Sequence, residues 1–247
     1  MNMKNGSLNI AVCISGGGTT MKEILRACKS RFLLHVNPAL VISSKPDAGG
    51  IVKAMEMGFP EKDTAVIVRK EFENPDAFGE AILRECRLRN VDLVAQCGFT
   101  PTMPPNVIAE YRKMIFNQHP GPLDGARPGF GGKGMRGLAV HHAVLHFAQR
   151  VGRSFMTEAT VHRVTDEVDG GAILGNRLVQ IWKDDDAEKL AVRVLPYEHN
   201  LVVETLLRFS EMREPREIHR GSPLIEPGEE ALLEEAIAAG VAAFPNG

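Results

Sequence analysis

The chain has 247 residues, 44% hydrophobic and 24% charged, which is typical of globular protein with one large domain or two small ones. Its 29 basic and 31 acidic residues give a formal net charge of −2, which argues against nucleic acid as a partner because such proteins are usually basic. We expect a cytoplasmic protein with no membrane contact, because the sequence has neither a run of about 20 apolar residues nor the apolar stretch of a signal peptide.

Residues up to about 120 show a regular alternation of strand and helix patterns. Asn74 is placed to cap a helix that has Pro75 at its first position. Strands that are apolar on both faces and alternate with helices are typical of parallel sheets. The strands are expected at 8–15, 38–43, 64–68, 92–98 and 113–119, and the helices at 19–32, 48–58 and 74–90. The pattern predicts an α/β fold with a Rossmann-like, mostly parallel, twisted sheet flanked by helices.

The pattern changes after residue 120. Residues 121–137 hold seven glycines and are expected to form a mobile loop. Two segments of alternating character then predict an antiparallel C-terminal strand pair, and Pro196 predicts a kink or break in the long helix that follows. The strands are expected at 154–165 and 172–182, and the helices at 138–151, 184–209 and 226–244.

The stretch "SGGGTT" joins the first strand to the first helix. Backbone N–H groups and the helix dipole at such a turn favour a phosphate. A tight turn without a ligand is the alternative. The turn is not a P-loop, and it lacks the last small residue of the dinucleotide fingerprint, where Met21 stands. The second strand also ends in Ser43 and Ser44 rather than an acidic residue. The candidate phosphate-binding residues are Gly16, Gly17, Gly18, Thr19 and Thr20.

Two further polar motifs end strands of the predicted sheet. "FNQHP" places Asn117 and His119 at the carboxyl end of a strand, where α/β sheets bind ligands. "VTDEVDGG" places Asp169 in a turn of the later strand pair, which could return over that edge. Either motif alone could be an ordinary turn. Together, an amide, an imidazole and a carboxylate suit acyl or formyl transfer, because they can bind an oxyanion and move a proton.

Cysteine and histidine patterns give little support for a metal. The cysteines are widely spaced, without a CxxC pair, and are expected to be reduced thiols. His142 and His146 are one helical turn apart, but no acidic or cysteine partner is spaced near them. We expect no metal site.

Five stretches in one order carry a resemblance to a known family. They are "NIAVCISGGGTTMKEIL", "VISSKPDAGGIVKA", "VDLVAQCGFTP", "FNQHP" and "TVHRVTDEVDGGAIL", with "VRVLPYEH" after them. From residue 9 to about 199 the chain resembles the phosphoribosylglycinamide formyltransferases, within the wider family of 10-formyltetrahydrofolate-dependent formyltransferases. The pairing of Asn-x-His-Pro with Val-x-Asp-Gly-Gly is far more specific than either half.

The resemblance implies a role for each matching residue. Asn117, His119 and Asp169 would be catalytic, residues 16–20 would bind the substrate phosphate, and Glu198 would contact the substrate. His162 would order the acidic turn or take part in catalysis. The residues that would frame the folate are Gly98, Phe99, Thr100, Pro101, Thr102, Met103, Thr165 and Asp166. The formyl donor would be 10-formyltetrahydrofolate, a co-substrate.

The sequence departs from the family around these motifs. The loop after His119 is longer and richer in glycine, and its Arg127, Lys133 and Arg136 could form a lid over an anionic substrate or remain in solvent. Thr20 stands where the family usually has Asn, and Leu195 where it has Gln. The resemblance implies a formyltransferase domain at 1–220 and a helical extension at 221–247.

Three functions are compatible with the sequence. The first is formyl transfer to glycinamide ribonucleotide in purine biosynthesis. The second is the same chemistry on another amine, such as an amino sugar nucleotide, or on water as a formyl-folate hydrolase. The third is a non-catalytic ligand-binding homologue. The partners expected are a phosphorylated amine and a reduced folate, and the chain could be a monomer or a homodimer.

Overall fold

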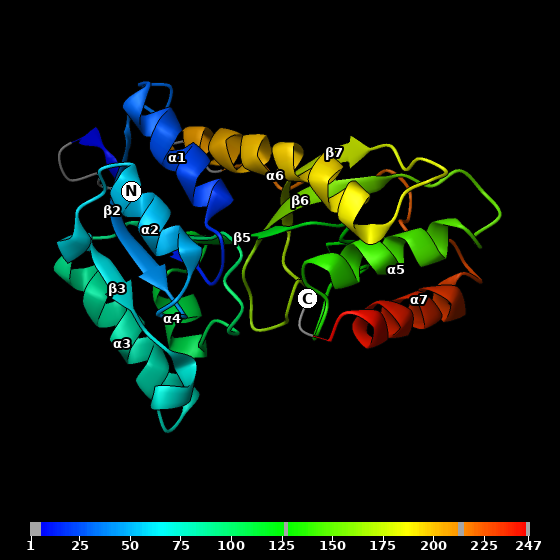
Figure 1. Ribbon diagram of the computed structural model, residues 1–247, viewed down its shortest axis with the longest axis horizontal. Coiled ribbons are helices and arrows are strands. Elements are labelled where there is room, and N and C mark those ends of the chain that lie inside the picture. The colour runs from blue at the N-terminus through cyan, green and yellow to red at the C-terminus, as the bar shows by residue number, and fades with distance from the viewer. Residues whose placement is uncertain (1–5, 126–127, 212–214, 246–247) are drawn as a thin grey trace. The chain divides into compact units, whose positions relative to one another are not determined.

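The structure is a computed structural model that describes residues 6–125, 128–211 and 215–245, and its elements alternate as predicted (Figure 1). The strands are β1 (Leu8–Ile14), β2 (Val36–Ser43), β3 (Thr64–Val66), β4 (Leu93–Gln96), β5 (Ile115–His119), β6 (Thr157–Arg163) and β7 (Ile173–Val179). The helices are α1 (Thr19–Lys29), α2 (Gly49–Glu56), α3 (Pro75–Leu88), α4 (Pro105–Glu110), α5 (Leu138–Ala148), α6 (Ala187–Ser210) and α7 (Glu230–Ala243). Two short 3-10 turns, η2 (Glu61–Asp63) and η3 (Arg69–Glu71), flank β3.

The strands form one sheet of seven, in the order β3-β2-β1-β4-β5-β6-β7. β1 pairs in parallel with β2 and β4, and β4 pairs in parallel with β5, whereas β6 and β7 are antiparallel. The predicted fold class is therefore confirmed. The reversal of strand order beside β1 is a topological switch point, the place where open α/β sheets bind ligands.

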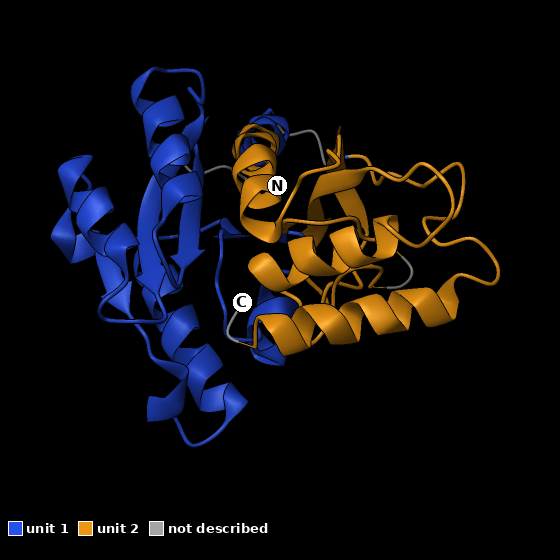
Figure 2. Cartoon of the chain, turned by 45° about the vertical axis from the view of Figure 1, so that its right-hand side comes forward, with its two compact units in different colours: residues 1–117, 202–215 blue, residues 118–201, 216–247 orange. Residues whose placement is uncertain are grey.

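The chain divides into two compact units, shown in two colours in Figure 2. The first unit is residues 1–117 with 202–215, and the second is residues 118–201 with 216–247. The boundaries fall inside β5 and inside α6, so both elements contribute residues to each unit. In the described part of the chain, every helix is too short or too polar to cross a bilayer.

The first unit owes its core to strands that are apolar on both faces. β1 and β4 are almost entirely buried, as expected for central parallel strands covered on both sides. α1 buries Met21, Ile24 and Leu25, which helical spacing brings to one face. α3 begins as predicted, because the Asn74 side chain accepts a hydrogen bond of 2.8 Å from the Ala77 backbone N–H.

The second unit has an aromatic core and a pair of packed helices. The buried ring of Phe130 lies 5.4 Å from that of Phe147 and 5.7 Å from that of Phe155, between ring centroids. α5 packs along α7. A Cβ atom on Gly240 of α7 would come within 2.3 Å of the Ala139 carbonyl oxygen, so this close approach requires glycine.

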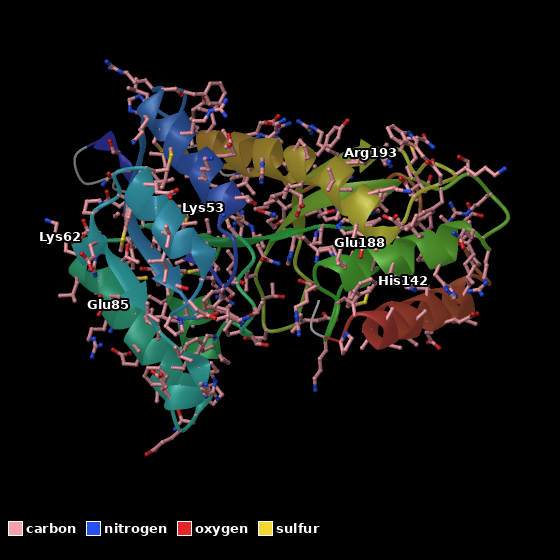
Figure 3. All side chains as sticks on the ribbon, viewed as in Figure 1. Lys53, Lys62, Glu85, His142, Glu188 and Arg193 are labelled. Atoms are coloured by element: carbon pink, nitrogen blue, oxygen red, sulfur yellow. The ribbon has the colours of Figure 1, made fainter. Side chains whose placement is uncertain are left out.

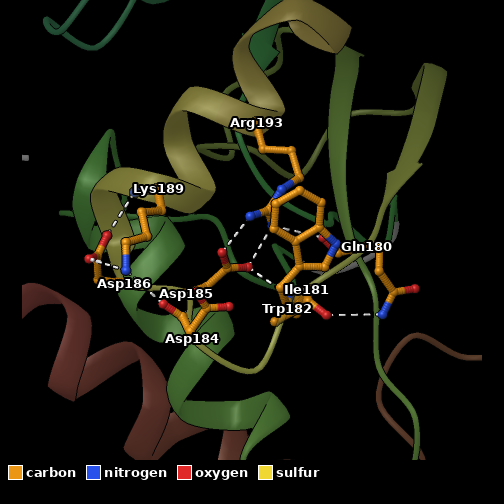
Figure 4. Close-up of polar contacts among 8 residues, drawn as sticks. All are labelled: Gln180, Ile181, Trp182, Asp184, Asp185, Asp186, Lys189 and Arg193. Carbon is orange, nitrogen blue, oxygen red and sulfur yellow. Dashed lines mark hydrogen bonds and ion pairs between the residues drawn. The ribbon is translucent and has the colours of Figure 1, made fainter.

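The start of α6 is held by a cluster of polar and aromatic side chains (Figure 4). Asp186 accepts a hydrogen bond of 2.8 Å from the Lys189 backbone N–H, and the Asp185 carboxylate binds the Arg193 guanidinium. That guanidinium lies 3.5 Å from the centroid of the Trp182 ring. The cluster fixes the turn between β7 and α6 through helix capping and cation–π stacking.

Pro196 neither ends nor breaks α6, which runs without interruption from Ala187 to Ser210. Of the predicted kink or break, the break is therefore wrong, and the kink stays a prediction. Proline removes one backbone hydrogen bond, whose acceptor would be the carbonyl of Val192 four residues earlier. The Val192 and Pro196 side chains are both exposed, so this part of the helix faces water, which can satisfy the carbonyl.

The four cysteines carry thiols rather than disulfides, as predicted. All four lie in the first unit, and Cys13, Cys86 and Cys97 are buried. Burial raises the pKa of Cys28 and of Cys86 to about 11. These thiols are therefore poor nucleophiles at neutral pH and fit the structural role expected from their spacing.

Candidate active site

The turn between β1 and α1 is built on a close contact of two glycines. Gly18 has a left-handed φ of 63°, and a Cβ atom there would come within 2.6 Å of the Gly50 Cα atom. The Gly50 backbone N–H donates to the Gly16 carbonyl oxygen at 2.9 Å. The start of α2 is thereby packed against the turn that starts α1.

The first turn of α1 offers uncapped N–H groups to an anion. Its N-cap residue, Gly18, has no side chain, and no acidic residue stands in the first turn. Gly16, Gly17 and Thr19 are exposed, whereas Thr20 is buried. Lys53 of α2, labelled in Figure 3, donates a hydrogen bond of 2.7 Å from Nζ to the Gly17 carbonyl oxygen. Its positive charge adds to that of the helix N-terminus.

Ser15 ties three strand ends together beside this turn. Its Oγ lies 2.5 Å from the Ser44 Oγ, at the end of β2. It also accepts a hydrogen bond of 2.8 Å from the backbone N–H of Thr100, in the loop after β4. This network gives Ser44 a structural role at the position where dinucleotide-binding domains carry an acidic residue.

The predicted folate-framing segment follows β4. Phe99 and Met103 are buried, whereas Gly98, Thr100 and Thr102 are exposed and Pro101 is half-buried. Gly98 has a left-handed φ of 75°, which glycine adopts without strain. The segment therefore presents mainly its backbone and small polar groups at the switch point.

β5 carries the predicted catalytic amide and imidazole at its carboxyl end. Asn117 is in register with Gln96 of β4, which is in register with Cys13 of β1. Asn117 therefore ends its strand at the same edge of the sheet as the glycine-rich turn. Asn117 and His119 are two residues apart and share one face of the strand, and Gln118 points to the other.

His119 is buried, and each of its ring nitrogens faces a different acceptor. Nε2 lies 3.1 Å from the Phe130 carbonyl oxygen, and Nδ1 lies 3.8 Å from an Asp169 carboxylate oxygen. A carbonyl oxygen only accepts, so Nε2 carries the proton and Nδ1 is the basic nitrogen that faces Asp169. Burial lowers the pKa of His119, while the charge of Asp169 raises it.

Asp169 is held from several sides in a strained turn. Its backbone has a left-handed φ of 56°, and its carboxylate accepts a hydrogen bond of 2.9 Å from the Gly132 N–H. His162 Nε2 lies 3.4 Å from the other carboxylate oxygen. Burial raises the pKa of Asp169, but His119, His162 and Gly132 outweigh it and lower the pKa to about 2. The carboxylate is therefore ionised at neutral pH.

His162 supports the acidic turn. Its ring is buried, and its Nδ1 lies 2.8 Å from the Arg163 carbonyl oxygen. With Nε2 against Asp169, the ring links the end of β6 to the turn that follows it. This geometry fits the ordering role that the resemblance allowed.

Glu198 is buried in α6 and bound to a residue between the two catalytic candidates. The Gln118 Nε2 donates a hydrogen bond of 2.8 Å to its carboxylate. Burial raises the pKa of Glu198 to about 7, against the effect of this hydrogen bond. The Gln118 Oε1 atom is buried without a hydrogen-bond partner. Glu198 and Gln118 together therefore offer a titratable carboxyl group and an amide oxygen that accepts no hydrogen bond.

The described residues of the loop at 121–137 form no helix or strand, as predicted. Its Phe130 and Met135 are buried, so the loop is anchored in the second unit. Lys133 and Arg136 are exposed, and Arg127 lies outside the described residues. In the acidic turn, Thr165 and Asp166 are exposed.

The histidines of α5 have separate environments. His146 Nε2 lies 3.1 Å from a carboxylate oxygen of Glu235 in α7, an acidic partner that is distant in sequence. Sequence spacing missed Glu235 because it lies 89 residues further along the chain. The His142 ring packs on Phe244, and His141 is buried, with its pKa lowered to about 4 by burial and by His119. In the described part of the chain, no three metal-ligating side chains gather.

The structure brings His119 and Asp169 together within the second unit. The turn at 16–20, the segment 98–103 and Asn117 belong to the first unit, and Glu198, Thr165 and Asp166 belong to the second. The sequence prediction missed Lys53 and Gln118. The position of Gln118 inside "FNQHP" was the one available signal for it; Lys53 had none, because its contact with Gly17 depends on the fold.

Comparison with known proteins identifies relatives over most of the chain. The family described as "Formyl transferase" matches residues 8–206. The phosphoribosylglycinamide formyltransferase of Haemophilus influenzae is 32% identical over 206 residues, covering 83% of this chain and 88% of the relative. The chloroplastic enzyme of Vigna unguiculata is 34% identical over 205 residues, which cover 83% of this chain. The chain spans only 61% of the length of that relative.

A solved structure gives the same result. Glycinamide ribonucleotide transformylase 1 from Symbiobacterium toebii superimposes with a TM-score of 0.73 and 28% sequence identity. The match covers 86% of this chain and 93% of that one. The family match at residues 8–206 includes both the switch point and the acidic turn.

Proposed function

The chain belongs to the formyl transferase family, and on that premise we propose that it transfers the formyl group of 10-formyltetrahydrofolate to the amine of glycinamide ribonucleotide, in purine biosynthesis. The observation that carries the proposal is the pairing of His119 with an ionised Asp169, 3.8 Å from Nδ1 to the carboxylate, at the end of β5. This pair accepts and holds a proton, which an amine must lose when it becomes an amide.

The first step forms a bond between the amine nitrogen and the formyl carbon. The π electrons of the carbonyl move to its oxygen, and the developing oxyanion needs hydrogen-bond donors. Asn117, on the same face of β5 as His119, supplies its amide N–H. Removing one such donor from an oxyanion site typically costs 10²–10³ in kcat.

The proton of the attacking amine moves next. His119 receives it at Nδ1, because the Phe130 carbonyl occupies Nε2. The Asp169 carboxylate, 3.8 Å from Nδ1, stabilises the imidazolium that forms. The bond between the formyl carbon and the folate nitrogen then breaks, the carbonyl re-forms, and the folate nitrogen takes the proton.

The glycine-rich turn supplies the site for the substrate phosphate. The N-terminus of α1, which has no side-chain cap, its helix dipole and the Lys53 ammonium all favour an anion at Gly16–Thr19. Residues 98–103, Thr165 and Asp166 would frame the folate. Glu198, with its pKa near 7 and the Gln118 amide beside it, would bind polar groups of the ribonucleotide.

The test is incubation of the protein with 10-formyltetrahydrofolate and glycinamide ribonucleotide, followed by measurement of tetrahydrofolate. We expect tetrahydrofolate to form only when the amine is present. Release of formate without the amine would identify a hydrolase instead. Binding of both ligands without turnover would identify a non-catalytic homologue.

A further inference from the structure

Two segments that depart from the family pack on each other in the second unit. The first is the loop 121–137, which is longer and richer in glycine than the family usually has. The second is the C-terminal segment, residues 216–245, which lies beyond the family match at 8–206. The loop also contacts both His119 and Asp169, so the contact between the two segments bears on catalysis.

Arg220 makes the main polar link between the segments. Its Nε and Nη2 donate to the Leu123 carbonyl oxygen at 2.8 and 2.6 Å. Its Nη1 and Nη2 donate to the two carboxylate oxygens of Glu158 in β6, at 2.8 and 2.6 Å. The Arg220 side chain is 15% exposed and that of Glu158 3%. The guanidinium thus ties the start of the loop to the sheet through a fork that only arginine provides.

Apolar contacts and a second hydrogen bond extend this link along the loop. A Cβ atom on Gly129 would lie 3.1 Å from the Leu224 side chain, and one on Gly134 would lie 3.3 Å from that of Val241. The Arg136 guanidinium donates to the Pro245 carbonyl oxygen at 3.4 Å. The C-terminal segment therefore contacts the loop near its start, its middle and its end.

The segment is itself fixed to the body of the second unit. The Ile218 N–H donates to the Ile173 carbonyl oxygen of β7 at 2.7 Å. Arg153 donates to the Leu224 carbonyl oxygen at 3.1 Å and to the Glu229 carboxylate at 2.7 Å. A segment anchored at these points can restrain a loop that its own glycines would leave free.

The backbone of the loop contacts both His119 and Asp169, so a restraint on the loop also restrains these two side chains. The Phe130 carbonyl oxygen faces His119 Nε2 at 3.1 Å, which selects the tautomer whose basic Nδ1 faces Asp169. The Gly132 N–H donates to Asp169 at 2.9 Å. A Cβ atom on Gly131 would lie 2.6 Å from the Asp169 Cβ, so the chain passes directly over this residue.

We propose that Arg220 is a positioning residue, through which the C-terminal segment holds the loop 121–137 against His119 and Asp169. The expected effect on the catalytic rate rests on the proposed function. The contact between Arg220 and the loop does not, and it can be measured without substrate. The loop has many glycines and so loses much backbone entropy on ordering, which makes an external restraint effective.

The test compares Arg220→Lys with the matched control Arg89→Lys. Lysine keeps a cation beside Glu158 but cannot make the forked hydrogen bonds to Leu123. Arg89 has a similar side-chain exposure, 17%, and likewise bridges carboxylates, those of Asp63 and Glu85, but these partners lie in the first unit. Hydrogen exchange of the Gly132 amide reports the Asp169 contact directly, and kcat, KM and the pH profile report catalysis.

In Arg220→Lys we expect the Gly132 and Phe130 amides to exchange roughly tenfold faster. We expect kcat to fall about tenfold or more with little change in the KM for the amine, and the pH midpoint of kcat to shift, since ring and carboxylate lose their alignment. Arg89→Lys should leave all of these unchanged. If Arg220→Lys does not fold, the double variant Arg220→Gln with Glu158→Gln, which removes both charges, takes its place.

Three results would overturn the proposal: wild-type exchange at Gly132 in the folded variant, faster exchange with unchanged kcat, or the same changes in Arg89→Lys. If the wild-type protein forms no tetrahydrofolate with the amine, the proposed function fails. Failure of exchange to respond to Arg220→Lys, in contrast, refutes the loop restraint whatever the activity. The two failures are therefore distinguishable.

Discussion

Asp169 combines a left-handed backbone with a partly buried, ionised carboxylate. Few residues tolerate this φ of 56°, and Asn and Asp are among them. The turn therefore presents a charge at a fixed point beside His119, and Gly132 and His162 keep it there. The strain is compatible with function, because such outliers gather at sites that hold reacting groups.

Asp169→Asn tests the charge without changing the backbone. Because Asn also adopts this conformation, we expect the variant to fold and its kcat to fall by about two orders of magnitude or more. Glu167→Gln, on the same turn but exposed and with no assigned role in binding, should retain near-normal turnover. Steady-state rates of tetrahydrofolate release decide the point, and a normal kcat in Asp169→Asn would contradict the proton-transfer mechanism.

His141 predicts a pH dependence of stability. Its folded pKa is about 4 and its ordinary value is 6.5, so between these pH values the unfolded chain binds more protons than the folded one. Stability is therefore lost as the pH falls from 6.5 to 4, by about 3 kcal/mol for this residue. Above 6.5 the effect vanishes.

Urea unfolding at pH 7 and pH 4.5 measures this effect. We expect His141→Leu to lose less stability than the wild type on going to pH 4.5, while exposed His219→Leu serves as the control. The Nδ1 of His141 is buried without a hydrogen-bond partner, so leucine removes a polar group that the site does not satisfy. Equal pH dependence in wild type and His141→Leu would refute the assignment.

Among the elements, the start of α1 depends on Gly18. Alanine at this position would have to adopt a left-handed φ, and its Cβ would meet the Gly50 backbone at 2.6 Å. We expect Gly18→Ala to displace the turn at a cost of about 1–2 kcal/mol and to raise the KM for the phosphorylated amine roughly tenfold.

Gly49→Ala is the matched control, since a Cβ there meets nothing within 4 Å, its φ is not in the left-handed region, and the residue lies outside the turn at 16–20. Titration with inorganic phosphate gives a second measurement that does not depend on turnover. Equal phosphate affinity in both variants and the wild type would place the anion elsewhere.

The elements themselves were largely predictable because each has a local signal. Continuous apolar runs marked the strands, and Asn74 with Pro75 marked the start of α3. α4 was not among the predicted helices, although it begins at Pro105 and proline is well suited to the first turn of a helix. Pro196 had predicted a kink or break, but α6 continues past it, because proline is tolerated on an exposed helix face.

The site was predictable only in part. Asn117, His119 and Asp169 were named as candidates because they stand at the end of a strand or in a turn of recognisable composition, and their catalytic role stays a prediction. Gln118 to Glu198 spans 80 residues and Arg220 to Leu123 spans 97, and neither partner carries a local pattern that names the other. Contacts between residues so far apart in the chain depend on tertiary packing, which cannot be predicted from local sequence patterns.

At the scale of the whole molecule, two units share two continuous elements. The boundary at 117/118 falls inside β5, and the boundary at 201/202 falls inside α6. If one unit unfolded alone, β5 and α6 would each be cut at the unit boundary, and only part of each element would stay folded. Because secondary structure is cooperative, we expect both units to unfold in one transition.

The chain provides separate probes for this prediction. Trp182, the one tryptophan, lies in the second unit, and all four cysteines lie in the first. Trp182 fluorescence and thiol reactivity should therefore give the same midpoint in urea. Gly240→Val, whose Cβ would meet the Ala139 carbonyl oxygen at 2.3 Å, destabilises the second unit by separating α7 from α5. If the units are coupled, this variant lowers both midpoints together, whereas a change in the Trp182 midpoint alone would show that the units unfold independently.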